Sequence, residues 1–405
     1  RTKTRRLVLL SGVPGSGKTL VGLQLVHAGW LDDLAGDRGR GKPPVPAAYL
    51  SGNGPLVAVL QDALSEAGGG GRTFVQDIKK YVAQYGRRNS AVPPEHLIVF
   101  DEAQRAHDRE RVAEVHRAPI GSSEPEHLIE FCERIPEWSV LVALIGDGQA
   151  IHVGEEVGVP LWAEAVAKAR DRERWQVHAA PALLEHFGRS GVRVKGDQAL
   201  SLDTEIRFHL TPRIHQWVGG LLGESSPESL AALGQELFEG GHRFLVTRDL
   251  NAAKEYLRER YSGAPEARYG VLASSKDRWL LDHGVDNSFQ TTKRLRVGHW
   301  YNAKPGSPNS CCGLDTVATE FSSQGLELDC ALLAWGSDLV RSRGEWSIAY
   351  SRGSRSPMRD PLSIRKNVYR VLMTRGRDGT MVFVPPEDRL YETYRFLLKS
   401  GARQL

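Results

Sequence analysis

The sequence predicts an α/β protein with two domains in tandem, each built around a parallel β-sheet. The chain of 405 residues is longer than one ordinary domain. Short apolar runs alternate with stretches of helical pattern, and this alternation restarts near residue 240. We expect the first domain to cover residues 1–200 and the second 201–405, with the joint between Asp197 and Gly240.

Apolar runs in the first half are predicted to be buried parallel strands, because each is followed by a turn that carries Gly, Asp or Ser. These runs are LVLL (7–10), AAYL (47–50), LIVF (97–100) and VLVALI (140–145). Helical patterns lie between them, for example at 20–31 and 126–135. The βαβ alternation favours a parallel sheet with helices on both faces.

The second half repeats the alternation but not the sequence. The predicted strands are RFLVT (243–247), YGVLASS (269–275), TVATEF (316–321), CALLAW (330–335) and MVFVP (381–385). The predicted helices are 251–261, 276–285, 367–375 and a last helix near the C-terminus. Stretches rich in Gly, Pro, Ser or Arg around 36–46, 67–72 and 341–363 are expected to be loops.

The composition indicates a soluble globular protein, with 40% hydrophobic and 25% charged residues. The longest uninterrupted apolar run, Val140–Ile145, is far too short to span a membrane, so no membrane partner is expected. The four cysteines lack metal-ligand spacing and are expected to be reduced thiols in a cytoplasmic protein. A sequence that lacks an initiating Met and reaches a motif within 20 residues suggests part of a longer protein.

The net charge of +4 is unevenly distributed. Residues 341–370 contain eight Lys or Arg against two acids, and residues 292–304 combine cations with His299, Trp300 and Tyr301. Two interpretations stay open with similar weight. The segments are either solvated loops, or they contact the phosphates and bases of a nucleic acid.

The stretch GVPGSGKT (12–19) follows a predicted strand and opens a predicted helix, which is the setting of a phosphate-binding loop. Its glycines let backbone N–H groups face the β-phosphate of ATP. Lys18 would reach the β- and γ-phosphates, and the Thr19 hydroxyl would complete the shell of Mg²⁺. The predicted nucleotide contacts are Gly12, Gly15, Ser16, Gly17, Lys18 and Thr19.

Two further strand ends carry polar residues suited to hydrolysis. In IVFDEAQRAH (98–107), Asp101 is predicted to hold Mg²⁺ and Glu102 to polarise the attacking water. The alternative, an acidic strand end or helix cap, is disfavoured because a phosphate loop requires such a partner. In GDGQ, Gln149 is suited to sense the γ-phosphate, although Asp-Gly turns are common.

The order GVPGSGKT, DEAQ and GDGQ resembles motifs I, II and III of superfamily 1 helicases. The segments YLSGNGPLV, VFDEAQRAH, LIGDGQAIHVGE, ATEFSSQGLELD and NVYRVLMTRGRDG more narrowly resemble the Schlafen-type (group 3) DNA/RNA helicase domain. The resemblance covers nearly the whole chain. It implies two RecA-like lobes of the P-loop NTPase class, with ATP in the cleft between them.

The resemblance also implies roles for single residues. Arg207 and Arg375 match the arginines of motifs IV and VI, which reach the γ-phosphate from the second lobe. Gln324, Gly325 and Glu327 match motif V, which couples nucleic acid to nucleotide and contacts the ribose. The predicted nucleic-acid contacts are Ser51, Asn53, His152, Arg296 and Trp300.

Alternatives remain for the arginines and for the function. Arg207 could be a surface cation, and Arg375 could cap a helix C-terminus. The favoured function is an ATP-hydrolysing motor that acts on single-stranded DNA or RNA. The alternative is an ATP-driven switch that gates a fused N-terminal nuclease or another partner domain without unwinding.

Overall fold

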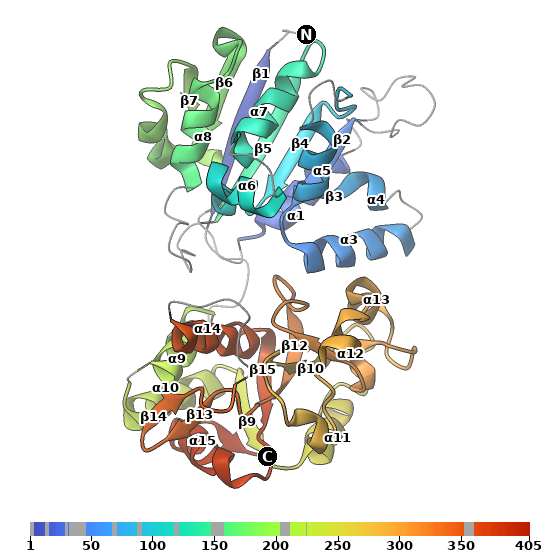
Figure 1. Ribbon diagram of the computed structural model, residues 1–405, viewed down its shortest axis with the longest axis vertical. Coiled ribbons are helices and arrows are strands. Elements are labelled where there is room, and N and C mark those ends of the chain that lie inside the picture. Colours follow the sequence, from blue (N-terminus) through green and yellow to red (C-terminus); the bar gives the residue numbers. More distant parts are fainter. Residues whose placement is uncertain are drawn as a thin grey trace. The chain divides into compact units, whose positions relative to one another are not determined.

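The computed structural model describes residues 4–12, 16–28, 31, 46–66, 71–86, 91–116, 121–146, 158–202, 211–223, 225–351 and 360–405. The chain divides into two compact units (Figure 1). Unit 1 comprises Arg1–Val57 and Leu64–Arg207, and unit 2 comprises Ala58–Ala63 and Phe208–Leu405. Each unit has its own parallel sheet.

The described part of unit 1 contains an eight-stranded sheet in the order β3-β2-β4-β5-β1-β6-β7, with β8 paired to β1. All of its pairings are parallel. The strands are β1 (Arg5–Gly12), β2 (Ala47–Ser51), β3 (Val75–Asp77), β4 (Leu97–Asp101), β5 (Ser139–Gly146), β6 (Trp175–Ala179), β7 (Arg193–Gly196) and β8 (Ser201–Leu202). The carboxyl ends of β1, β4 and β5 therefore lie at one edge, where an α/β sheet binds its ligands.

Helices pack on both faces of this sheet. The helices of unit 1 are α1 (Lys18–Val26), α4 (Gly71–Phe74), α5 (Ile78–Tyr85), α6 (Arg109–His116), α7 (Glu124–Arg134) and α8 (Gly158–Ala167). Helix α3 (Gly54–Glu66) is shared, because its residues Ala58–Ala63 belong to unit 2. Ile98 and Phe100 of β4 belong to a core cluster with residues of α5, α7 and α8. Val99 points to the other face, where α1 packs closely: a Cβ on Gly22 would lie 3.1 Å from Val99 Cγ1.

Arg5 at the start of β1 fixes the end of α7. Its side chain is 3% exposed and donates three hydrogen bonds to backbone carbonyls, at 3.1 Å to Cys132, 2.6 Å to Glu133 and 3.3 Å to Ile135. The last carbonyls of a helix have no partner within the helix, so a cation at this place satisfies them.

Replacing Arg5 with Met should therefore lower the free energy of unfolding by about 2–4 kcal/mol, because buried carbonyls lose their donors. Arg6→Met is the matched control. Arg6 lies on the opposite face of the strand and is half-buried, so its loss should have a much smaller effect. Urea denaturation of both variants measures the difference, and equal losses would refute the capping role of Arg5.

The described part of unit 2 contains a six-stranded parallel sheet in the order β11-β10-β12-β15-β9-β16, and an antiparallel hairpin of β13 and β14. The strands are β9 (Arg243–Thr247), β10 (Tyr269–Ala273), β11 (Val317–Thr319), β12 (Leu328–Ala334), β13 (Val340–Ser342), β14 (Glu345–Ser347), β15 (Gly376–Phe383) and β16 (Arg403–Gln404). The helices are α9 (Thr211–Leu222), α10 (Pro227–Glu239), α11 (Leu250–Arg260), α12 (Phe289–Lys293), α13 (Val297–Asn302), α14 (Pro361–Met373) and α15 (Asp388–Lys399).

A buried polar cluster fixes α14 to the strand ends of unit 2. Arg365 of α14 forms an ion pair with Asp338 at 3.1 Å, and both side chains are at most 5% exposed. Asp338 also accepts hydrogen bonds from Ser274 at 2.5 Å and from Tyr369 at 2.6 Å. Because the charges are paired and hydrogen-bonded, the cluster holds α14 in one position.

The predicted α/β class and the predicted strand positions are confirmed, but two local predictions are wrong. Within 276–285 only Leu280–His283 is helical, as a 3₁₀ turn. The Asp277 carboxylate accepts the backbone N–H groups of Trp279 and Leu280 at 2.8 and 2.7 Å, and Gly284 with φ 81° ends the turn.

The segment 341–363, expected to be a loop, contains β14 and the start of α14. Arg341 stacks over Phe396, with its guanidinium carbon 3.7 Å from the ring centroid, and this contact anchors the hairpin. Among the residues that the structure describes, no helix has the length and apolar character needed to cross a bilayer.

Candidate nucleotide-binding site

The predicted phosphate loop connects β1, which ends at Gly12, to α1, which begins at Lys18. Gly17 precedes the helix with φ 89°, a left-handed conformation that glycine adopts without strain. The Lys18 ammonium donates to the Gly12 carbonyl at 2.7 Å. Gly15 lies outside the described residues.

The loop leaves no space for a side chain at Gly12. A Cβ there would lie 2.6 Å from Ser16 Oγ and 2.9 Å from Leu202 Cβ. Ser16 is 1% exposed, and its hydroxyl has no hydrogen-bond partner among the described residues. A buried hydroxyl without a partner beside the start of a helix is suited to donate a hydrogen bond to a phosphate oxygen.

Asp101 ends β4 beside Thr19 of α1. One carboxylate oxygen, Oδ2, accepts hydrogen bonds from the Thr19 hydroxyl at 3.3 Å and from the Tyr49 hydroxyl at 2.5 Å. The other, Oδ1, accepts the backbone N–H of Glu102 at 3.0 Å. Asp101 is 3% exposed, and this burial raises the pKa of its carboxyl to about 6. The hydrogen bond from Tyr49 acts in the opposite direction and lowers the pKa.

Glu102 stands in a strained turn directly after β4. Its φ of 55° is in the left-handed region, which is uncommon for residues other than glycine. Gln104 bridges this turn to the next strand: Nε2 donates to Glu102 Oε2 at 2.5 Å, and Oε1 accepts the N–H of Gly146 at 2.9 Å. The bridge fixes the Glu102 carboxylate relative to the end of β5.

Two of these contacts were not expected from the sequence. Tyr49 had no predicted role, since a tyrosine within an apolar strand gives no signal of its partner. Gln104 belongs to the DEAQ segment, but only the fold shows that it meets Gly146. Gln149, His152 and Arg207 lie outside the described residues.

The residues of this site fit Mg²⁺, which prefers hard oxygen ligands and keeps several of its waters. The Thr19 hydroxyl and the buried Asp101 carboxylate supply two such oxygens 3.3 Å apart. The unpartnered Ser16 hydroxyl and the Lys18 ammonium lie on the adjoining loop. These residues suit a metal ion that is bound by the protein and by the phosphate oxygens of a nucleotide together.

In unit 2, the predicted motif V and motif VI residues meet at the amino ends of β12 and β15. Gln324, Gly325 and Glu327 are exposed, and Gly325 has φ 72°. The Tyr301 hydroxyl donates to the backbone carbonyl of Glu327 at 2.7 Å, which supports the loop from α13.

Arg375 connects this loop to α14. Its Nε donates to the Val371 carbonyl at 2.9 Å, and one terminal nitrogen donates to the Leu326 carbonyl at 3.1 Å. The first contact is the helix-capping role that was considered as an alternative. The second places the guanidinium beside Gly325 and Glu327, so the structure brings the predicted residues of unit 2 together.

The sequence of residues 5–386 matches the family described as Schlafen group 3, DNA/RNA helicase domain. This match extends over most of the chain. The chain belongs to this helicase-domain family. The resemblance seen in the motifs is therefore confirmed. The two units, each built on one parallel sheet, are the tandem RecA-like lobes of the chain. No curated protein matches the chain.

Three solved structures are similar to this helicase domain, each 12% identical to it. The arterivirus nonstructural protein 10 helicase has a TM-score of 0.31, with 96% of this chain and 62% of that chain covered. A DEAD box protein from Methanococcus jannaschii has a TM-score of 0.29, with 99% of this chain and 88% of that chain covered. The Pyrococcus furiosus Hef helicase domain has a TM-score of 0.30, with 98% of this chain and 95% of that chain covered. The helicase domain thus spans less than two thirds of the arterivirus chain, and likeness at these TM-scores carries no inference about function.

The predicted nucleic-acid contacts of the helicase domain divide into buried and exposed residues. Trp300 is 1% exposed in the core of unit 2, where Gly270 leaves room for its ring, so the prediction that it stacks on a base is wrong. Ser51 is 0% exposed, and its hydroxyl accepts the N–H of Asn53 at 3.1 Å, so a direct contact is also wrong for Ser51. Asn53 is half-buried and Arg296 is exposed, so both can reach a ligand.

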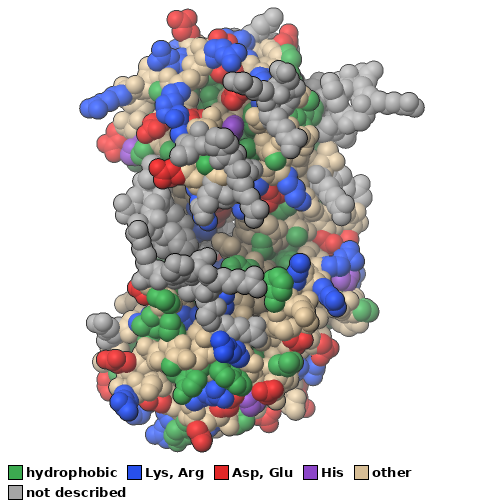
Figure 2. All heavy atoms as spheres, in the orientation of Figure 1, with side chains coloured by type: hydrophobic (Ala, Val, Ile, Leu, Met, Phe, Trp, Pro, Cys, Tyr) green, Lys and Arg blue, Asp and Glu red, His purple; other side chains and the backbone are tan. Residues whose placement is uncertain are grey.

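The charged side chains of the described residues do not form a patch of one sign on the face shown in Figure 2. On the face shown in Figure 2, cationic and acidic side chains are interspersed over the described parts of both units. Lys293, Arg294 and Arg296 of the predicted basic stretch are exposed. Arg365 of the other stretch is buried in its ion pair with Asp338, so that cation has a structural role.

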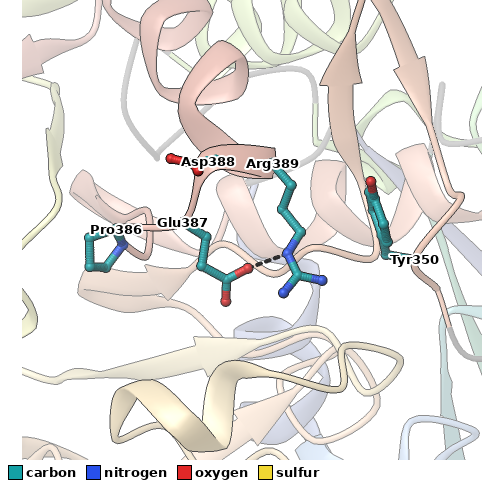
Figure 3. Close-up of a pocket in the computed structure, with 5 residues that line it drawn as sticks. All are labelled: Tyr350, Pro386, Glu387, Asp388 and Arg389. Atoms are coloured by element: carbon teal, nitrogen blue, oxygen red, sulfur yellow. Dashed lines mark ion pairs between the residues drawn. The ribbon is translucent and has the colours of Figure 1, made fainter.

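A pocket of about 500 Å³ in unit 2 lies apart from the motif residues (Figure 3). It is lined by Tyr350, Pro386, Glu387, Asp388 and Arg389. Glu387 is paired with Arg389 and, at 2.7 Å, with His283. Because the Glu387 carboxylate is already engaged by Arg389 and His283, the pocket gives no argument for a second active site.

Proposed function

We propose that this helicase domain hydrolyses ATP with Mg²⁺ and couples the hydrolysis to single-stranded DNA or RNA. The observation that carries the proposal is the contact between Thr19 and Asp101 at 3.3 Å beside the loop that holds Lys18. These are the residue types that position phosphates and metal in P-loop enzymes. Membership of a DNA/RNA helicase family supports the same conclusion.

In this proposal the residues of unit 1 have separate tasks. Lys18 exchanges the Gly12 carbonyl for the β- and γ-phosphates, where its charge stabilises the transition state. Thr19 and Asp101 would hold Mg²⁺, and the ion would supply positive charge that neutralises the phosphates of the nucleotide. Glu102 accepts a proton from the attacking water, and Gln104 keeps the carboxylate in place for that step.

We infer that Arg375 contributes to the same reaction from unit 2. Its guanidinium is held by two backbone carbonyls, Val371 and Leu326, which orient it beside the motif V loop. A preorganised arginine stabilises the charge on the departing γ-phosphate without reorganisation during the step. Glu327, exposed on the same loop, is suited to accept a hydrogen bond from the ribose.

The nucleic acid would contact exposed aromatic rings and cations of unit 2. Phe289 on α12 is 70% exposed and Phe321 after β11 is 67% exposed. Lys293 lies 5.6 Å from the centroid of the Phe289 ring. Rings that stack on bases, with cations nearby for phosphates, bind single strands with little sequence preference.

The deciding experiment measures ATP hydrolysis by the purified chain alone and with single-stranded DNA or RNA, at low and moderate salt. We expect hydrolysis to rise with either strand, and the rise to shrink as salt increases, because phosphate contacts release counterions. Phe289→Ala combined with Phe321→Ala should weaken the stimulation without altering basal hydrolysis. Normal hydrolysis that no nucleic acid stimulates would refute the motor and favour an ATP-driven switch.

A further inference from the structure

Tyr49 is a buried tyrosine in contact with the predicted metal site. It lies in β2 and is 0% exposed, and its hydroxyl donates to Asp101 Oδ2 at 2.5 Å. The proposed reaction assigns it no task. A strand residue with no exposed surface cannot touch nucleotide or nucleic acid, so any role must act through the groups that its hydroxyl meets, Asp101 first and Thr19 beside it.

The ring of Tyr49 is fixed by its packing. Helix α1 lies so close to it that a Cβ on Gly22 would lie 3.0 Å from Tyr49 Cε2.

The Asp101 carboxylate gains a fixed orientation from its donors. The Glu102 N–H holds Oδ1 at 3.0 Å, and the Tyr49 hydroxyl holds Oδ2 from β2. The Thr19 hydroxyl, at 3.3 Å from the same oxygen, makes a longer bond on the side where the phosphate loop lies. When Thr19 turns to a metal, Tyr49 remains as the side-chain donor that keeps Oδ2 in place.

We propose that Tyr49 is a positioning residue that holds Asp101 in the orientation required for Mg²⁺ to bind with the nucleotide. The inference rests on the proposed function, because it presumes that Asp101 serves the metal. Hydrogen-bond donors behind a metal-supporting carboxylate restrict its rotation and tune its affinity, and their removal typically weakens metal binding about 10- to 100-fold.

The structure supplies a matched control in the same unit. Tyr81 is likewise 0% exposed, and its hydroxyl donates to the buried carboxylate of Glu95 at 2.9 Å. Tyr81 packs against Tyr85 and Phe131 in the core cluster, away from the phosphate loop. Tyr81→Phe and Tyr49→Phe remove the same chemical group from the same kind of buried pair.

The test measures binding of a fluorescent ADP by the full chain while Mg²⁺ is titrated, and again in EDTA. For Tyr49→Phe we expect the Mg²⁺ concentration at half-saturation to rise about 10- to 100-fold, with ADP affinity in EDTA unchanged. For Tyr81→Phe we expect the Mg²⁺ dependence of the unsubstituted protein, whatever the loss in thermal stability. In an Asp101→Asn background, Tyr49→Phe should have no further effect on Mg²⁺ dependence.

The outcomes distinguish a failure of the role proposed for Tyr49 from a failure of the proposed function. Unchanged Mg²⁺ dependence in Tyr49→Phe, or an equal change in Tyr81→Phe, overturns the role of Tyr49 and leaves the proposed function standing. A further effect of Tyr49→Phe in the Asp101→Asn background shows that Tyr49 does not act through Asp101, and also overturns it. Absence of Mg²⁺-dependent ADP binding by the unsubstituted protein overturns the proposed function together with this inference.

Discussion

Lys18→Ala is expected to reduce the rate of ATP hydrolysis by about 10²- to 10³-fold or more, since one preorganised cation at a transferring phosphoryl group has this effect. The Lys18 ammonium lies 2.7 Å from the Gly12 carbonyl. Alanine at the first position of α1 is compatible with the helix, since alanine is the best helix former. The loss should therefore appear in both nucleotide affinity and turnover.

Lys168→Ala is the control for this prediction. Lys168 is a lysine of the same unit with a side chain that is 50% exposed, paired with Glu126 and Glu164. Its removal changes the net charge equally but should leave steady-state hydrolysis as it was. A Lys18→Ala variant that is folded by circular dichroism and hydrolyses ATP at the normal rate would exclude this loop as the nucleotide site.

Arg375→Ala should lower turnover by about 10³-fold or more, the effect typical of an arginine that stabilises a departing γ-phosphate. Affinity for ADP should change little, because the arginine acts on charge that develops in the transition state. Arg375→Lys should not restore turnover, since an ammonium cannot reproduce the planar fork that the Val371 and Leu326 carbonyls orient.

A purely structural role for Arg375 predicts a different pattern. Arg248 is a second arginine of unit 2 that donates to backbone carbonyls, at 3.1 Å to Pro385 and 3.1 Å to Glu387. If both arginines only support the backbone, Arg248→Ala and Arg375→Ala should reduce thermal stability and turnover together. We expect both to lose stability and only Arg375→Ala to lose turnover, as measured by thermal melting and single-turnover hydrolysis.

The sequence was sufficient to predict the central strands because parallel strands buried on both faces are short apolar runs with a polar turn at each end. The sequence also predicted that Lys18, Thr19 and Asp101 follow strand ends, and the structure brings Thr19 and Asp101 into contact. Their roles toward nucleotide and metal stay predictions. β6 and β7 were not predicted: WQVHA alternates with polar residues, and β7 is exposed along its whole length.

Contacts between distant segments could not be predicted from local pattern. Tyr49 and Asp101 come together because β2 pairs in parallel with β4. Gln104 reaches Gly146 because β4 and β5 are neighbouring strands in the sheet. Trp300 was misjudged for a related reason. It lies in a stretch of sequence rich in cations (292–304), whereas its neighbours in space are core residues beside Gly270.

The left-handed backbone at Glu102 has a consequence for anyone who designs or selects variants of this protein. A residue with a Cβ is strained at φ 55° by about 1–2 kcal/mol, whereas glycine is not. A screen that rewards only thermal stability or expression would therefore favour glycine at this position and discard the carboxylate. Under the proposed function, stability and activity are opposed at Glu102, so variants should be selected on hydrolysis and not on folding alone.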